Sequence, residues 1–411
     1  MSSSGGGIRV LLLTETYWPE IGGGERQAAS LGAALTRRGH TVTILTRRSR
    51  PELAREELGG NLRVVRLSPV GRGRRRKWGL AATSLPALMR LRGEHDVVLV
   101  SGFRMLGIPA LLARLCGGRP TILKADSIGE MSGEYFRAGL AESGLSLDRA
   151  TVRAGLAMRN ALLRTADAFV AISGAIDQEL RGSGVEPERI HRIPNGVDIS
   201  VFRPASTAER QAMRHSLGMP IDGRLVVYTG RLVSYKGLPT LLRAWRELPA
   251  QGEAATLALV GEAGGDIRGC ERELRAYAQD HGLSVRFAGP SSRVQDWLRA
   301  ADLFVFPSED EAFGLSLVEA MACGLAAVAT RVGGLADFVV DGVNSAVVLP
   351  GDAQGLCQAI SSLLQDRPLA DQLGRAAREL VVARFDEGAV ARAYETVIMR
   401  VLGTTRVGRA A

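Results

Sequence analysis

Short apolar runs rich in β-branched residues alternate along the chain with segments in which apolar residues recur at helical spacing. This alternation predicts parallel sheets covered by helices on both faces, because strands buried on both sides are apolar throughout. One expected helix is the amphipathic segment 25–38, which Gly39 ends, and another begins at Ala175. The expected strands are 8–14, 41–46, 96–101, 120–124, 167–173, 224–230, 256–261, 285–289, 302–308, 326–330 and 345–349.

With 411 residues the chain is too long for a single core, so two domains are expected. A seam falls at 189–204, where a Pro-Asn-Gly turn precedes an irregular segment that contains another proline. We therefore predict two Rossmann-like domains, 1–200 and 201–387. Ligands of such sheets bind at the carboxyl ends of the strands.

The last helical segment, 384–402, is apolar along one face. We expect this face to pack on the first domain, to which residues 388–411 would return. The positions on that face are Val390, Tyr394, Val397 and Val401.

Composition narrows the class of protein. The net charge of +9 favours anionic partners. Four widely separated cysteines form no Cys-x-x-Cys pair, which predicts a reduced, cytoplasmic environment without a disulfide framework or zinc site. No apolar run is long enough to cross a bilayer, and the run at 8–14 is expected to be a strand rather than part of a signal peptide.

One dense basic run stands out, and it has two interpretations. It is either a solvated loop or a patch that binds the anionic inner face of the plasma membrane, with a tryptophan as interfacial anchor. Nucleic acid is not expected, because no nucleic-acid-binding module accompanies the run. The residues concerned are Arg72, Arg74, Arg75, Arg76, Lys77 and Trp78.

Two glutamates flank a predicted helix start in EAFGLSLVEAMACG, residues 311–324. Backbone N–H groups at such a start can bind phosphate, while Glu311 and Glu319 can accept hydrogen bonds from sugar hydroxyls. The structural alternative is a capping box, with Ser316 as N-cap and Glu319 three positions later. The segment alone does not decide between the two.

A second segment, GRLVSYKG at 230–237, carries two cations between glycines at the end of an expected strand. Arg231 and Lys236 are suited to bind a diphosphate, although two surface cations would have the same sequence. In the first half, Gly22–Gly24 permit close approach of the backbone to a ligand. That triplet matches neither the dinucleotide-binding nor the Walker pattern.

These motifs together resemble the group 1, family 4 glycosyltransferases, which have the GT-B fold. That fold consists of two Rossmann-like domains facing across a cleft, with the C-terminal helix crossing back to the first domain. The resemblance extends over nearly the whole chain and is looser at 50–160. It is carried by the Gly22–Gly24 loop, RIPNGVD (192–198), GRLVSYKG, EAFGLSLVEAMACG and the segment 329–348.

The resemblance implies a retaining transfer of a sugar from a UDP- or GDP-sugar to a hydroxyl of a glycan, lipid-linked or small-molecule acceptor. Arg231 and Lys236 would neutralise the departing diphosphate, Glu311 would bind donor-sugar hydroxyls, and Glu319 would bind the ribose. No cofactor and no essential metal is expected, since the chain has no Asp-x-Asp. The other implied donor-binding residues are Gly23, Gly24, Gly230, Phe313, Gly314 and Leu315.

The chain departs from the family where many members carry a histidine after the strand equivalent to 120–124. Here the segment reads KADSIGEMSG (124–133). Candidate acceptor-side residues are Lys124, Asp126, Glu130 and Asn195. The missing histidine keeps open a non-catalytic nucleotide-sugar-binding protein, and a GT-B-type epimerase or phosphorylase is the other alternative.

Overall fold

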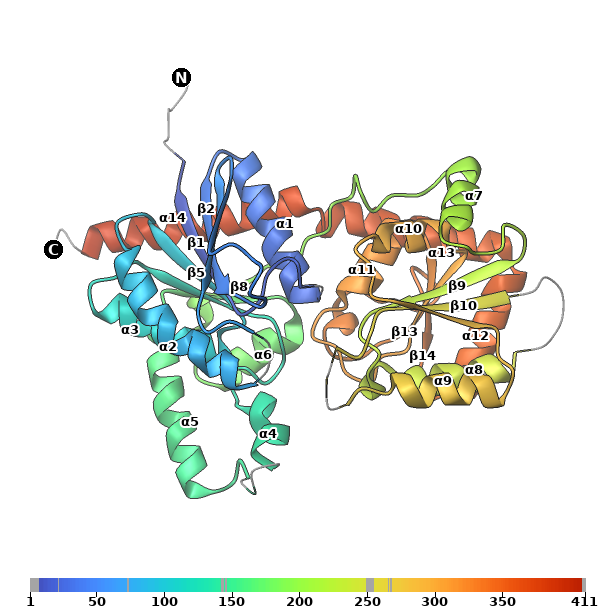
Figure 1. The fold of residues 1–411 in the computed structure, drawn as a ribbon, viewed down its shortest axis with the longest axis horizontal. Coiled ribbons are helices and arrows are strands. Elements are labelled where there is room, and N and C mark those ends of the chain that lie inside the picture. The colour runs from blue at the N-terminus through green and yellow to red at the C-terminus, as the bar shows by residue number, and fades with distance from the viewer. Residues whose placement is uncertain are drawn as a thin grey trace. The chain divides into compact units, whose positions relative to one another are not determined.

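The computed structural model describes residues 7–20, 22–71, 74–141, 144, 146–248, 255–264, 266 and 268–408. The chain divides into two compact units (Figure 1). Unit 1 comprises Met1–Gly196 and Glu387–Ala411, and unit 2 comprises Val197–Asp386. The boundaries thus lie a few residues before those expected from the sequence.

Unit 1 contains a sheet of eight strands among the described residues, in the order β3-β4-β2-β1-β5-β6-β7-β8. All neighbours are parallel except β3 and β4. The strands are β1 (Arg9–Thr14), β2 (Thr41–Arg47), β3 (Glu56–Gly59), β4 (Leu62–Leu67), β5 (Val97–Ser101), β6 (Thr121–Ala125), β7 (Ala168–Ala171) and β8 (Ile190–Arg192).

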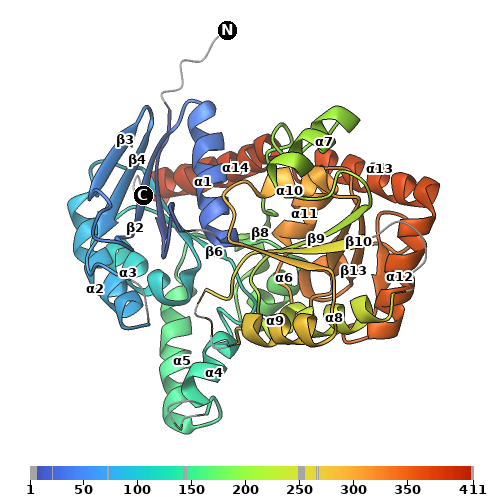
Figure 2. The same ribbon diagram turned by 45° about the vertical axis from the view of Figure 1, so that its right-hand side comes forward.

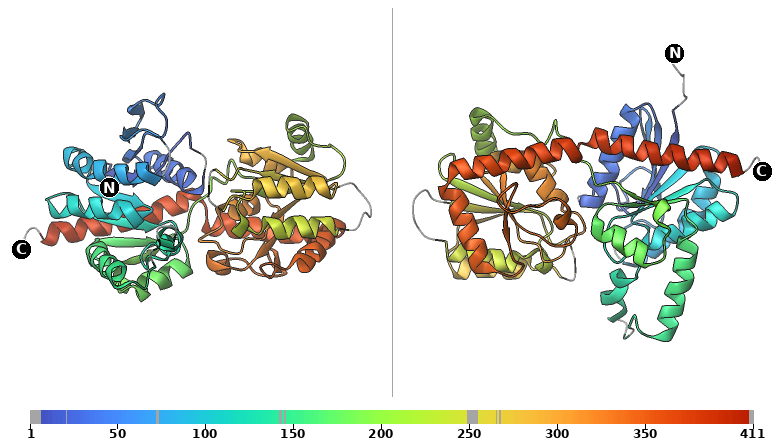
Figure 3. Two further views of the ribbon diagram at one scale, coloured as in Figure 1. Left: turned by 60° about the horizontal axis from the view of Figure 1, so that its bottom comes forward. Right: turned by 180° about the vertical axis from the view of Figure 1, so that it is seen from behind.

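Helices connect most of these strands, although β2, β3 and β4 follow one another without a helix. Helix α14 belongs to the same unit although it is the last helix of the chain (Figure 3). The basic run corrects one expectation, because α2 begins at Arg74 and the run from there on is helical instead of forming a loop. The helices are α1 (Gly23–Arg37), α2 (Arg74–Arg90), α3 (Phe103–Leu115), α4 (Arg137–Ala141), α5 (Ala150–Leu163), α6 (Gly174–Gly182) and α14 (Glu387–Gly408), with short 3₁₀ turns at Glu134–Phe136 and Pro187–Arg189.

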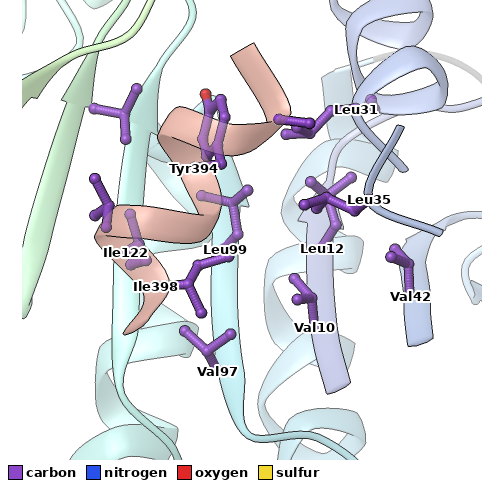
Figure 4. Packing of buried hydrophobic residues seen from close by; sticks show 14 of the residues in the cluster. Val10, Leu12, Leu31, Leu35, Val42, Val97, Leu99, Ile122, Tyr394 and Ile398 are labelled. Atoms are coloured by element: carbon purple, nitrogen blue, oxygen red, sulfur yellow. The ribbon is translucent and has the colours of Figure 1, made fainter. Parts of the chain in front are cut away.

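The core of unit 1 confirms the predicted apolar face of the last helix. Tyr394 and Ile398 of α14 pack against Leu99 and Ile122 of the sheet, as Figure 4 shows, beside the apolar face of α1. The predicted positions Val390, Tyr394, Val397 and Val401 are all buried in this cluster. Burying large apolar side chains contributes about 1.5–3 kcal/mol each, so α14 is a structural part of unit 1.

Unit 2 contains a parallel sheet of six strands among its described residues, in the order β11-β10-β9-β12-β13-β14. Its strands are β9 (Arg224–Thr229), β10 (Ala255–Val260), β11 (Val285–Gly289), β12 (Leu303–Phe306), β13 (Ala326–Thr330) and β14 (Ala346–Val348). Its helices are α7 (Thr207–Ser216), α8 (Leu238–Arg246), α9 (Glu271–Asp280), α10 (Val294–Ala300), α11 (Leu315–Ala322), α12 (Ala353–Gln365) and α13 (Arg367–Arg384), and the 3₁₀ turns are η3 (Ser234–Lys236) and η4 (Gly333–Asp337).

Every strand expected from the apolar runs is present, which confirms the pattern-based prediction of two parallel-sheet α/β units. Three strands of unit 1 were missed. The edge strand β3 is exposed at every residue, and Figure 2 shows it at the outer side of its sheet. It pairs with β4, in which Arg63 and Arg66 interrupt the apolar run, and β8 is only three residues long.

Candidate active site

The carboxyl edge of the unit 2 sheet has a switch point between β9 and β12. From β9 the chain continues to β10 and β11 on one side, and from β12 it continues to β13 and β14 on the other. Loops diverge at such a point and leave room for a ligand. Arg231 and Lys236 follow β9, and Glu311 follows the neighbouring β12. The structure therefore brings the three residues predicted as catalytic to one point of the fold.

Lys236 and Glu311 contact each other directly. The Nζ atom of Lys236 is 2.5 Å from Oε2 of Glu311, and both side chains are largely buried. The two loops are also joined by a hydrogen bond of 2.9 Å that the Glu309 N–H donates to the carbonyl of Tyr235. This arrangement holds an ammonium suited to an anion beside a carboxylate suited to hydroxyl groups.

Arg231 has two partners that the sequence did not single out. Its Nη1 lies 2.8 Å from a carboxylate oxygen of Asp266, and its Nη2 donates a hydrogen bond to the hydroxyl of Tyr235. Arg268 stacks on the Tyr235 ring at 4.2 Å and lies 3.5 Å from the same Asp266 carboxylate. One signal was available, because Asp266 follows β10, the strand next to β9, and so lies at the same edge.

Gly230 begins this loop with a φ of +151°, and a Cβ there would lie 2.7 Å from the hydroxyl oxygen of Tyr228. That hydroxyl donates a hydrogen bond of 3.0 Å to the carbonyl of Arg231. Burial raises the pKa of Tyr228 well above its usual value, so the hydroxyl stays protonated. The buried tyrosine therefore fixes the backbone that carries the Arg231 guanidinium.

Helix α11 begins at Leu315 with Gly314 as its N-cap, and no side chain caps it. The capping box of Ser316 and Glu319 is therefore wrong. Gly314 has a φ of +89°, and a Cβ there would lie 2.3 Å from the Leu335 side chain, so glycine is required. Among the described residues, no hydrogen-bond acceptor receives the N–H groups of Phe313, Gly314 or Leu315. They are available to an anion.

Glu319 and Phe313 occupy different environments from Glu311. Glu319 is 2% exposed, one turn into α11. The Phe313 ring packs 5.9 Å from Phe338 and 5.6 Å from Phe385, which anchors the loop before the helix. The Glu311 side chain is 14% exposed, whereas Glu319 is almost completely buried.

In unit 1, the glycine triplet is partly helical. Gly22 is the N-cap of α1, while Gly23 and Gly24 form its first turn, which corrects the expectation that all three precede the helix. The Glu25 carboxylate folds back toward this turn and accepts a hydrogen bond from the Thr16 hydroxyl. A Cβ at Gly22 would lie 2.3 Å from that carboxylate.

Two of the candidate acceptor-side residues form an ion pair. The buried ammonium of Lys124, at the end of β6, contacts the Asp126 carboxylate, which also accepts a hydrogen bond of 2.6 Å from Ser101 at the end of β5. From β1 the chain continues to β2 on one side, and from the neighbouring β5 it continues to β6 on the other, so the switch point of unit 1 lies between β1 and β5. Ser101 lies at this point, and Lys124 and Asp126 lie beside it at the end of β6.

Asn195 lies in the same region. It lines a small pocket together with Ser101, Lys124 and Tyr394. The Asn195 Oδ1 atom is buried and accepts no hydrogen bond from a described residue. The pocket thus offers polar groups from the sheet edge, the segment after β8, and α14.

Glu130 is fully buried and holds a loop in place. Its oxygens accept backbone N–H groups of Arg104 at 3.1 Å and of Asp126 and Ser127 at 3.0 Å. The Arg104 guanidinium lies 3.7 Å away and is also hydrogen-bonded to Glu15 at 3.0 Å. These contacts favour a positioning role for Glu130, and neither Arg104 nor Glu15 was singled out from the sequence.

The stability of the protein should depend on the charge of Glu130. Burial raises its pKa to about 7. Because the unfolded chain releases this proton near pH 4–5, the free energy of unfolding should fall as pH rises from there to about 7, by up to roughly 3 kcal/mol. Urea unfolding of Glu130→Gln should show a flatter profile over this window. Exposed Glu134→Gln is the control, and an unchanged slope in Glu130→Gln would contradict the assignment.

The basic run is described only in part. Arg72 lies outside the described residues, as do the side chains of residues 74–77, while Trp78 is exposed. No helix in the described part of the chain is long and apolar enough to cross a membrane.

Comparison with known proteins identifies the family of the chain. The chain matches the model described as Glycosyltransferase Family 4 over residues 21–201 and the model described as Glycosyl transferases group 1 over residues 209–380. A Catenulispora acidiphila protein named D-inositol 3-phosphate glycosyltransferase 2 is 34% identical over 328 residues, which cover 77% of this chain and 73% of that protein.

Solved structures share the fold over almost the whole chain. Sucrose-phosphate synthase from Thermosynechococcus elongatus is 25% identical with a TM-score of 0.81, covering 97% of this chain and 100% of that one. Anabaena HepE, solved in complex with UDP-glucose, is 23% identical with a TM-score of 0.73, covering 95% and 99%. The family models, the relative and the fold confirm the resemblance drawn from the motifs, and the chain belongs to the group 1, family 4 glycosyltransferases of the GT-B fold.

Proposed function

We propose that this glycosyltransferase moves a sugar from a nucleoside-diphosphate donor to an acceptor hydroxyl with retention of anomeric configuration. The observation that carries the proposal is the contact between Lys236 and Glu311 at the switch point of unit 2. A diphosphate sugar presents an anion and a ring of hydroxyls side by side. An ammonium beside a carboxylate matches that combination.

The charge that develops during transfer assigns the roles. As the glycosidic bond breaks, negative charge grows on the diphosphate and positive charge on the sugar ring. Lys236 and Arg231 stabilise the leaving diphosphate, and Glu311 binds the sugar hydroxyls. The N–H groups of Phe313, Gly314 and Leu315 hold phosphate, and Glu319 binds the ribose. Gly23, Gly24 and Gly230 remain candidate donor contacts.

Two cations at the leaving group supply what a divalent metal supplies in other transferases, so we propose that the reaction needs no metal. For the donor, HepE was solved with UDP-glucose, which makes UDP-sugars the first to test. For the acceptor, relatives carry the name D-inositol 3-phosphate glycosyltransferase, which makes a phosphorylated cyclitol the first candidate.

Donor binding tests the proposal. A panel of UDP-, GDP- and ADP-sugars should contain one donor that stabilises the protein in EDTA and so raises its melting temperature. At a donor concentration one hundred times Kd, the stabilisation should be about 2.7 kcal/mol. Arg231→Ala should weaken that binding roughly tenfold or more, because a charge-assisted hydrogen bond contributes about 1.5–3 kcal/mol. Calorimetry gives the Kd, and Arg246→Ala, which removes an exposed cation paired with Glu247, is the control.

Turnover separates this function from its alternatives. With the bound donor and an acceptor, NMR of the product should show the anomeric configuration of the donor. Donor binding without transfer to any acceptor would indicate a non-catalytic binding protein, and conversion of the donor without acceptor would indicate an epimerase. A product of inverted configuration, or transfer only with Mg²⁺, would overturn retention or metal independence respectively.

A further inference from the structure

Among the described residues of unit 1, one buried arginine, Arg47, has neither a hydrogen-bond acceptor nor an ion-pair partner. Three arginines are buried among the described residues: Arg47, Arg66 and Arg214. Arg66 pairs with Glu57 and donates to two backbone carbonyls. Arg214 pairs with Asp302 and donates to three carbonyls. By contrast, no described residue accepts a hydrogen bond from Arg47 or forms an ion pair with it.

This isolation is energetically unfavourable in the free protein. Arg47 is only 5% exposed, and its Nε and Nη1 atoms are buried without a hydrogen-bond partner. Burying a charge is costly unless it is paired and hydrogen-bonded. A protein that keeps such a group has an uncompensated cost that a bound anion would remove.

The position of Arg47 indicates where that anion binds. Arg47 is the last residue of β2, opposite Leu67, the last residue of β4, and β2 lies beside β1. It therefore lies at the carboxyl edge of the sheet, the side on which ligands of such folds bind. The segment after β4 is hydrogen-bonded to the residue that follows Arg47, because the Gly71 N–H donates to the Arg48 carbonyl at 3.0 Å.

The start of α2 adds positive potential at this edge. A Cβ at Gly79 would lie 2.4 Å from the Pro69 ring, so the first turns of α2 pack against the segment that follows β4. The N-terminus of a helix favours anions through its backbone dipole.

We propose that Arg47 belongs to a phosphate-binding site at the carboxyl edge of unit 1. The planar fork of a guanidinium binds phosphate oxygens in pairs, which suits a phosphate monoester or diester. Two sources have this chemistry: a phosphorylated acceptor and the headgroup of an anionic lipid. The first source rests on the proposed transferase function, whereas phosphate binding as such does not.

Arg47→Met tests the site by stability and by ligand binding. Without ligand, the variant should have a higher melting temperature than the wild type, because an unpaired buried charge is replaced by an apolar side chain of similar length. Arg66→Met is the matched control and should melt lower, since it leaves Glu57 and two carbonyls without their partner. A lower melting temperature for Arg47→Met would mean a structural role and would overturn the proposal.

Ligand binding distinguishes the two sources of phosphate. Inositol 3-phosphate, but not inositol, should stabilise the wild type, and its Kd should rise roughly 10- to 100-fold in Arg47→Met. Flotation with phosphatidylglycerol vesicles is the second assay. If Arg47→Met loses binding only to the vesicles, the phosphate recognised by the site would be that of a lipid headgroup. Unchanged binding in both assays would overturn the site. Neither assay contains a sugar donor. Failure of the phosphate site is therefore distinct from failure of the transferase assignment, which the donor panel tests.

Discussion

Lys236→Ala should lower kcat for sugar transfer by about 10²–10³, the usual loss when a preorganised group that stabilises transition-state charge is removed. The ammonium is largely buried and fixed by Glu311 at 2.5 Å, so it needs no reorganisation as the diphosphate departs. Its removal also leaves the Glu311 carboxylate uncompensated next to the position of the diphosphate. Steady-state kinetics with saturating donor and acceptor would measure the loss.

Lys236→Ala is interpretable only beside a matched substitution. Arg243 is exposed on α8, the helix that begins two residues after Lys236, and Arg243→Ala should leave kcat within a factor of about two. The double variant Lys236→Ala/Glu311→Gln should lose less than the two single losses combined, because contacting charges are coupled. A kcat of Lys236→Ala within a few-fold of the wild type would remove Lys236 from the catalytic group.

The main features of the fold followed from the apolar runs, because strands buried on both faces have few polar residues. The misses have the opposite cause. In β4 the Arg66 side chain is buried only because Glu57, on the antiparallel β3, neutralises it. Neutralisation of a buried arginine by a neighbouring strand depends on strand pairing, which the local sequence pattern does not indicate. A run interrupted by arginine therefore did not indicate a strand.

The candidate site was predicted where chemistry and strand order agreed. Arg231, Lys236 and Glu311 follow strands, and a parallel sheet brings strand ends to one edge. Asp266 and Tyr235 were missed because both act through contact with Arg231, and Asp266 is 35 residues away from Arg231 in the sequence. The position of Asp266 after β10 was the one signal available. Arg47 was missed for a related reason, since a buried charge without a partner is recognised only in the folded chain.

The start of α11 shows how packing decides between local alternatives. Ser316 and Glu319 have the spacing of a capping box, which would begin the helix later than observed. The observed start at Leu315 follows from Gly314, whose left-handed backbone brings it against Leu335 in a way that no side chain allows. Tertiary contact, rather than the cap sequence, sets the position of the N–H groups assigned to phosphate.

Gly237→Ala should be the most destabilising of the substitutions considered, lowering the free energy of unfolding by about 3–5 kcal/mol. Gly237 has a φ of +70°, which costs a residue with a Cβ about 1–2 kcal/mol. A Cβ would in addition lie 1.9 Å from the carbonyl oxygen of Pro307, just after β12, so the backbone must move. Urea unfolding would measure the loss.

Gly342→Ala separates the two contributions. Gly342 has a φ of +67°, and a Cβ there would meet no atom within 4 Å, so this variant should lose only the cost of the backbone conformation. The difference between the variants then measures the contact of Gly237 with Pro307, which holds the Lys236 loop against the loop of Glu311. If the clash spreads these loops apart, the folded Gly237→Ala protein should also bind donor more weakly than Gly342→Ala. Equal losses of stability in the two variants would mean that the loops move freely, and that the pairing of Lys236 with Glu311 is not maintained by this backbone contact.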